Sequence, residues 1–571
     1  MSSYSASIWK RSSNKLRQGE VWLEYFYLSG LFVAASILFL INLAGLPLLD
    51  PDEAVLAQVA KEIYQSTESW SGIFPSLWNE PYLDTPPLVH NLVAIAYKIA
   101  GVNELTTRFP GALLGAISTI LVYSVGREIF VARLPALFSA LVYLTCLPVV
   151  RFSRLATLDG PLLCFEILTI WAVLRSRRDL RWAAVAGLGW SLMSLTRGLF
   201  GVQILLLALL FLLWDTPRLL TSAYFWTGLA IGSLPCLAWY LAQWLRYGDL
   251  ESADLINLVM SQTAAVNIGL GLPISYYLLQ SLQYFVPWSV VMFAGLKSIE
   301  PNLHWGWGKL LAVWLGGYIV IGFLLLERNY WFLLPLYPAL ALAAGRKLSR
   351  IRNLPSYVAY PQMWVIGFSL MAILAASAGL YWGINNYVDF YLPFICGSLC
   401  VTFGATAVAI SQRDSQFIPL LFWGLFVSMF LLFVSPHWIW EMKAITSVKP
   451  IAEFIRQHTP PKATIYSSMS NARPSLNFYS DRQVIPQSIE ELEQHWQQNS
   501  AVYLLLDSSA RIRLNLPPQA IVKDNRPESS DWVLAIKKEK STLAWISRAR
   551  AINLDRDLEG WRVPISITES L

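Results

Sequence analysis

The sequence predicts a polytopic α-helical membrane protein that ends in a smaller extramembrane α/β domain. The 571 residues are 55% hydrophobic and only 14% charged, whereas about a quarter of the residues of soluble proteins are charged. Many apolar stretches reach the roughly 20 residues that a helix needs to cross a bilayer. After about Glu441 the chain turns polar. This composition excludes a cytosolic enzyme, a disordered chain and a simple nucleic-acid binder.

The first membrane span is expected at about 25–46, behind a polar arm at 1–24. This arm carries Lys10, Arg11, Lys15 and Arg17. The apolar stretch is too long for a removable signal peptide and lacks a small-residue cleavage site. We therefore expect a retained helix with the N-terminus in the cytoplasm.

Twelve more apolar stretches follow, so that about thirteen spans are expected, each near the length that a bilayer requires. They lie near 107–125, 134–150, 160–175, 183–196, 199–214, 222–245, 274–296, 309–326, 330–344, 362–383, 391–411 and 417–435. Alternation from an inside start places the basic clusters around Arg127, Arg177 and Arg346 in the cytoplasm, as the positive-inside rule requires. The expected protein is a multi-pass protein of a bacterial inner or plasma membrane, whose C-terminal end is periplasmic.

A long acidic loop at about 47–106 separates the first two spans of the expected transmembrane domain, 25–440. Ordered loops of this length are usually functional. Residues 53–64 have the apolar spacing of a helix that could lie flat on the membrane. The apolar stretch 88–100 is short for a span, so we expect a juxtamembrane or re-entrant helix there.

The remaining residues, 441–571, are expected to form a periplasmic α/β domain. Strand patterns lie at 463–467, 501–507 and 532–536, and a helical pattern at 489–497. A segment of this length is large enough for a core of its own.

Candidate functional residues gather at the predicted outer ends of several helices. They are Asp52, Glu53, Asp84, Arg151, Arg154, Asp159, Arg197, Arg246, Glu327 and Arg328. Charged groups near a bilayer are costly and usually face a cavity or a partner. Interfacial anchoring explains any one of them equally well, but their convergence on one side favours a site. Carboxylates and arginines together suit a reaction in which a hydroxyl or amine loses a proton while a phosphate leaves.

Several short motifs resemble, in order and spacing, a known group of multi-span enzymes. The motifs are 51–58, 82–87, 105–130, 155–161, 195–198, 287–289 and 328–335. They are similar to those of the lipid A aminoarabinose transferases and the related protein O-mannosyltransferases, which are glycosyltransferases of the GT-C superfamily. The resemblance covers the membrane part to about residue 345 and implies a GT-C-like fold.

The resemblance implies that a sugar passes with inversion from a polyprenyl-phosphate donor to a lipid, glycan or protein acceptor at the outer face. Asp52 would be the general base or a carboxylate that orients the acceptor, and Asp159 a second carboxylate that positions substrate. Arg197 and Arg328 would bind the lipid phosphate, because the planar guanidinium offers paired donors to phosphate oxygens. Further substrate contacts would come from Glu53, Asp84, Arg154 and Tyr330. Membrane lipids are the other expected partners, and no nucleic acid is expected.

The chain departs from the aminoarabinose transferases at two cationic positions. Val55 and Thr85 stand where those enzymes have an arginine and a lysine. Arg151, Arg154 or Arg246 would have to replace them, and the sugar stays open. No cofactor is indicated, and a divalent metal is left open but disfavoured, since only His90 and His437 lie near the site by topology.

Two other functions remain open. A transporter or flippase of a lipid-linked or polar substrate would also line a cavity with charges, but transporters often show repeat symmetry, and no repeat is visible here. A structural assembly factor would tolerate changes at Asp52, which the enzyme would not.

Overall fold

The structure is a computed structural model whose described part covers most of the chain in ten segments. These are 2–198, 200–248, 285–325, 334–355, 360–385, 389–440, 448–499, 501–517, 520–523 and 532–537. The described chain divides into two compact units. One contains Met1–Leu46 and Val59–Trp440, and the other contains Pro47–Gln58 and Glu441–Leu571.

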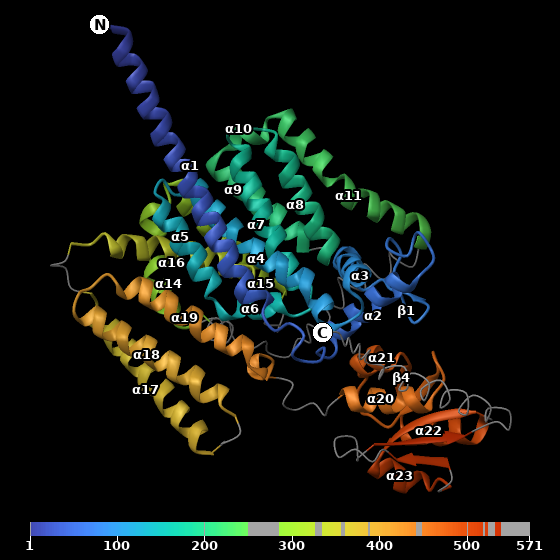
Figure 1. Ribbon diagram of the computed structural model, residues 1–571. Coiled ribbons are helices and arrows are strands. Elements are labelled where there is room, and N and C mark those ends of the chain that lie inside the picture. Colours follow the sequence, from blue (N-terminus) through green and yellow to red (C-terminus); the bar gives the residue numbers. More distant parts are fainter. Residues whose placement is uncertain are drawn as a thin grey trace, which may run out of the picture. The chain divides into compact units, whose positions relative to one another are not determined.

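The first unit is a bundle of helices (Figure 1). Its helices are α1 (Ser2–Leu40), α2 (Asp52–Gln65, shared with the second unit), α3 (Leu88–Ala100), α4 (Glu104–Ile129), α5 (Arg133–Leu144), α6 (Leu147–Arg154), α7 (Asp159–Ser176), α8 (Trp182–Arg197), α9 (Phe200–Asp215), α10 (Pro217–Leu220), α11 (Ala223–Tyr247), α14 (Ser289–Leu296), α15 (Gly306–Leu325), α16 (Leu336–Arg352), α17 (Gln362–Asn385), α18 (Tyr391–Ser411) and α19 (Phe417–Val434). A short hairpin of β1 (Ser76–Leu77) and β2 (Glu80–Pro81) precedes α3.

The bundle is built by helices that pack beside their neighbours in the chain. The helix α4 packs against α1, α5 and α7, α8 lies between α7 and α11, and α17, α18 and α19 pack in succession. The helices α7 and α8, which a short turn joins, run in opposite directions, whereas α5 and α6 form a bent pair. The start of α7 and the end of α8 are therefore at the same end of the bundle, together with the end of α6 and the start of α4.

Within the described residues, six helices are long and apolar enough to cross a membrane, or seven if the bent pair α5 and α6 is one span. The six are Val21–Leu40 within α1, α4, α11, α17, α18 and α19. This is fewer than the expected thirteen or so spans. Several of the predicted spans form helices that are too short or too polar to be counted by length and apolar composition alone. For example, α8 and α9 have 16 residues each, and α7 contains Asp159, Glu166 and Arg175.

The second unit has a mixed five-stranded sheet in the order β4-β3-β5-β7-β6. Its elements are α20 (Val448–His458), β3 (Thr464–Ser467), α21 (Pro474–Ser480), β4 (Gln483–Pro486), α22 (Ile489–Gln498), β5 (Val502–Asp507), α23 (Ser508–Leu514), β6 (Ile521–Lys523) and β7 (Trp532–Lys537). The strand β3 is parallel to both β4 and β5, while β7 is antiparallel to β5 and β6.

Helices cover both faces of this sheet, because its central strands are apolar on both sides. In β5, Leu505 joins the cluster formed with α20 and α21, whereas Leu504 and Leu506 join the cluster formed with α22 and α23. This alternation follows from the two-residue period of a strand. The segment 47–58, which the sequence assigned to an external loop of the membrane domain, belongs to this unit.

Candidate functional site

Asp159 and Arg197 form an ion pair where α7 begins and α8 ends. Nη1 of Arg197 donates to Oδ1 of Asp159 at 2.8 Å. The hydroxyl of Thr157 donates to Oδ2 of the same carboxylate at 3.1 Å. Asp159 is 7% exposed. Both oxygens of this carboxylate therefore have donors.

Two glycines fix the backbone on either side of this pair. A side chain at Gly160 would place a Cβ 2.9 Å from Cα of Ser153 in α6 and 3.1 Å from the carbonyl oxygen of Gly111 in α4. Only glycine therefore lets the first turn of α7 approach these two helices. Gly198 has a φ of +53° and ends α8 directly after Arg197, a conformation that favours glycine.

Arg154 does not face an open site, in contrast to its expected role in substrate binding. It is fully buried and donates to the carbonyls of Leu38 and Ile41, each at 2.6 Å. Its guanidinium also lies over the rings of Phe433 and Trp438. The last carbonyls of a helix have no partner within the helix. Arg154 satisfies carbonyls at and just after the end of α1, which gives it a structural role there.

Arg108, near the start of α4, resembles Arg154 in that it is buried and donates to backbone carbonyls. The sequence did not indicate this role. Arg108 is fully buried, and its Nη1 donates to the carbonyls of Leu43 and Leu46 at 2.8 and 2.7 Å. A cation at the end of a helix also opposes the negative end of the helix dipole. Arg108 and Arg154 thus hold the chain as it leaves α1.

The two other arginines that could replace the missing cations stack on aromatic rings. Arg151 donates to the carbonyl of Trp438 at 3.1 Å and lies 3.6 Å from the ring centre of Trp440. Arg246, in the last turn of α11, lies 4.3 Å from the ring centre of Phe74. Aromatic contacts therefore anchor both arginines.

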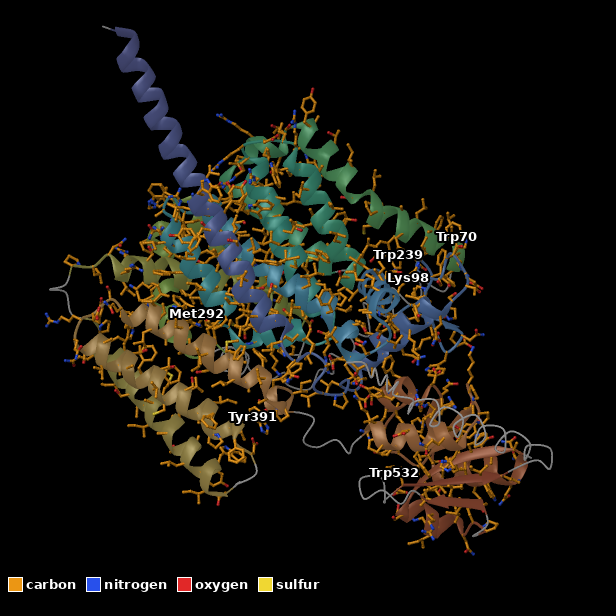
Figure 2. The ribbon with its side chains drawn as sticks, in the orientation of Figure 1. Trp70, Lys98, Trp239, Met292, Tyr391 and Trp532 are labelled. Atoms are coloured by element: carbon orange, nitrogen blue, oxygen red, sulfur yellow. The ribbon has the colours of Figure 1, made fainter. Side chains whose placement is uncertain are left out.

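The polar segment after α2 is anchored to the same end of the bundle. Trp239 and Gln243 of α11 donate to the carbonyl of Ile73 at 3.0 and 3.1 Å. Figure 2 labels Trp239 of α11 and Trp70 of this segment. Glu62 of α2 accepts from the backbone N–H of Trp78 at 2.9 Å. The hairpin of β1 and β2 is therefore fixed between α2 and α11.

Asp84 and the two histidines occupy different surroundings. Asp84 is exposed between β2 and α3. His90 is buried against the ring of Tyr82, and burial lowers the pKa of His90 to about 4, so the ring is neutral near pH 7. His437 contacts the carboxylate of Asp389. Within the described ranges, no group of three or more His, Cys, Asp or Glu side chains could hold a metal ion.

The acidic motif lies in the second unit, at the start of α2. Asp52 is the first residue of this helix and is exposed. Glu53 is fully buried, and its Oε2 accepts from the backbone N–H of Leu49 at 2.7 Å. Glu53 therefore closes the turn that leads into α2, instead of pointing into open space. Arg328 and Tyr330 lie outside the described residues.

Comparison with known proteins supports the resemblance that the motifs indicated. The family model described as dolichyl-phosphate-mannose-protein mannosyltransferase matches residues 84–241. An uncharacterized protein of Aquifex aeolicus is 24% identical over 472 residues, which are 80% of this chain and 87% of that protein. An undecaprenyl phosphate-alpha-4-amino-4-deoxy-L-arabinose arabinosyl transferase of Pseudomonas fluorescens is 26% identical over 329 residues, 56% of this chain and 59% of that protein.

The fold also matches a solved structure. ArnT from Cupriavidus metallidurans, determined with bound undecaprenyl phosphate, is similar with a TM-score of 0.70 at 17% identity, over 90% of this chain and 98% of that one. The predicted resemblance to aminoarabinose transferases and the predicted GT-C-like helical fold are thus confirmed.

Proposed function

We propose that this chain, which resembles the aminoarabinose transferases in sequence and fold, is an inverting membrane glycosyltransferase. Its donor is a sugar linked to a polyprenyl phosphate, and its acceptor is a hydroxyl or amine of a lipid, glycan or protein. The reaction takes place at the outer face of a bacterial inner or plasma membrane.

The observation that carries this proposal is the ion pair between Asp159 and Arg197 at the start of α7. The carboxylate of Asp159 orients Arg197, and a guanidinium is the side-chain group whose planar donors match phosphate oxygens. The first turn of a helix also presents backbone N–H groups and the positive end of the helix dipole. A phosphate that gains charge as it leaves would be stabilised at such a place.

The chemistry then follows from the two carboxylates and the arginines. Asp52 takes the proton of the acceptor hydroxyl or amine as its oxygen or nitrogen attacks the anomeric carbon. The bond from that carbon to the phosphate oxygen breaks, and the polyprenyl phosphate leaves with the electron pair. Arg197, with Arg328 as a further candidate, compensates the charge of the phosphate. A single displacement inverts the anomeric centre, so no covalent enzyme intermediate is required.

The topology that serves this reaction has about thirteen spans, a cytoplasmic N-terminus and a periplasmic C-terminal domain. The described residues contain six or seven helices that are long and apolar enough to cross a membrane. The other spans of the proposed topology are shorter or partly polar helices. Buried inside a bundle, such helices need not be apolar on every side. The acidic loop and the Asp159 end of α7 then face the periplasm.

A flippase of the same lipid-linked sugar is the alternative, and one experiment separates the two. Purified protein is reconstituted in vesicles with polyprenyl phosphates that carry different labelled sugars, together with candidate lipid, glycan and peptide acceptors. A transferase releases polyprenyl phosphate and forms a product of inverted configuration. Movement of intact donor across the vesicle membrane, with no cleavage for any sugar and acceptor, would contradict the proposal and favour the flippase.

A further inference from the structure

The segment 47–58, which carries the acidic motif, belongs to the same compact unit as the C-terminal α/β sheet. Its partner in that unit is α21, the short helix between β3 and β4. These two stretches are more than 400 residues apart in sequence, since Asp50 and Ser475 are separated by 425 positions. No sequence motif indicates that they meet.

Polar contacts join the two stretches directly before the motif. The backbone N–H of Leu48 donates to the hydroxyl of Tyr479 at 2.9 Å. Oδ1 of Asp50 accepts from the backbone N–H of Ser475 at 2.6 Å, and Oδ2 accepts from the hydroxyl of Ser475. Nε of Arg473 lies 3.7 Å from Oδ2 of Asp50. Asp50 is therefore bound through both of its carboxylate oxygens.

Apolar contacts hold the segment both before and after the motif. Leu48 and Ala57 are buried together with Phe478, and the ring of Tyr479 packs against this cluster. The motif residues Asp52 and Glu53 lie between Leu48 and Ala57 in the chain. The segment is thus fixed to α21 both before and after these two residues.

The helix α21 is itself anchored in the core of the unit. Leu476 of α21 is buried in the main core of the unit, beside Ile451 and Ile455 of α20. The side chain of Asn477 accepts from the backbone N–H of Val484 at 3.0 Å, which ties α21 to β4. A segment bound to α21 is therefore held in place relative to the sheet.

We propose that the C-terminal unit positions the catalytic carboxylate: Ser475 and Tyr479 of α21 are positioning residues that hold Leu48 and Asp50, and thereby set the place of Asp52. This inference rests on the proposed function, because it assigns Asp52 the role of general base. Proton transfer requires hydrogen-bond distance between the base and its proton. Asp52 is the first residue of α2 and follows Leu48 and Asp50 closely in the chain, so a shift of these two residues would move it.

The test uses the full-length protein and conservative variants with matched controls. Tyr479→Phe removes the acceptor of the Leu48 N–H and keeps the packed ring. Its control is Tyr466→Phe, since Tyr466 lies in β3 and stacks on His495. Ser475→Ala removes one donor to Asp50. Its control is Ser480→Ala in the same helix, since the hydroxyl of Ser480 donates only within α21, to the carbonyl of Leu476.

The readouts are kcat and donor KM per folded molecule, together with hydrogen exchange of the peptide that covers 47–53. We expect Tyr479→Phe with Ser475→Ala to lower kcat by about 10- to 100-fold, the cost of a displaced catalytic group, with little change in donor KM. Hydrogen exchange of the 47–53 peptide should become faster. Neither control should change kcat or exchange.

Two results would overturn the inference. If the double variant turns over like the wild type while Asp52→Asn is inactive, the enzyme proposal stands and the positioning role fails. If kcat falls but the exchange of 47–53 does not change, the residues do not act by holding this segment. A wild type that transfers no sugar would instead remove the proposed function itself, which is a separate outcome of the same assay.

Discussion

Arg197 at the end of α8 holds Asp159 at the start of α7 at 2.8 Å, and a second ion pair of similar geometry lies at the opposite end of α7. There Nη1 of Arg177 lies 2.7 Å from Oδ2 of Asp215. The side-chain exposures are also alike, 20% and 9% in the first pair and 21% and 11% in the second. The chain therefore contains an internal control for the proposed phosphate site.

The first prediction compares Arg197→Gln with Arg177→Gln. Loss of Arg197 should lower kcat/KM for the lipid-linked donor by about 100- to 1,000-fold, because a group that compensates the leaving charge is gone. Loss of Arg177 should change kcat/KM little, and Asp215 keeps Lys309 at 3.3 Å. Both variants are compared per folded molecule. Equal kcat/KM values for the two would exclude Arg197 from phosphate binding.

The second prediction concerns Arg154, which the structure assigns to the end of α1. In Arg154→Met the buried carbonyl of Leu38 and the partly buried carbonyl of Ile41 lose their donor, at about 1–3 kcal/mol for a buried unsatisfied group. The variant should unfold at a lower temperature in detergent, while its remaining folded fraction binds polyprenyl phosphate normally. Arg154→Lys should not restore the stability, since one ammonium lacks the guanidinium fork. If the variant keeps its stability but no longer binds the donor, Arg154 is a substrate-binding residue and this prediction is wrong.

The third prediction is a pH dependence of the C-terminal unit through Asp507. Burial alone would raise the pKa of Asp507, but hydrogen bonds from Ser509, Ala510 and Ser468 favour its charged form, and the net result is a lowered pKa. A carboxylate whose pKa is lowered on folding stabilises the folded state at pH values above the ordinary carboxyl pKa. This stabilisation is lost as the pH falls through the pKa that the carboxylate has in the folded state.

The measurement is hydrogen exchange of β5 and α23 in the wild type and in Asp507→Ala. Because Asp507 is the N-cap of α23, the variant should lose about 1 kcal/mol at pH 6. The difference between the two proteins should shrink as the pH falls below about 4. A difference that stays constant from pH 6 to pH 3 would contradict the role of the ionised carboxylate.

Much of the fold could be predicted from the sequence, because hydrophobic periodicity depends on nearby residues. The apolar stretch 88–100 forms α3, and the strand pattern at 501–507 forms β5. The number of spans could not be predicted in this way. A buried helix such as α7 can be apolar and still carry Asp159 and Glu166, so its mean hydropathy does not show whether it crosses the membrane.

The candidate site could be predicted only in part. Asp159 and Arg197 were expected to act together, and the structure pairs them. Arg154 was expected to bind substrate, but its guanidinium donates to carbonyls at the end of α1. No local sequence pattern indicates this contact. The contact of Asp50 with Ser475 was also not predictable, because it joins positions 425 residues apart.

The most direct test of the account is the transfer activity of Asp52→Asn beside that of Glu68→Gln. Both changes remove one negative charge from the acidic loop, and Glu68, like Asp52, is exposed. With a polyprenyl-phosphate sugar that the wild type uses, Asp52→Asn should lower kcat by about 100- to 10,000-fold, the contribution of a general base, and Glu68→Gln should leave it unchanged. Wild-type turnover in Asp52→Asn would contradict the central claim that Asp52 is the catalytic base.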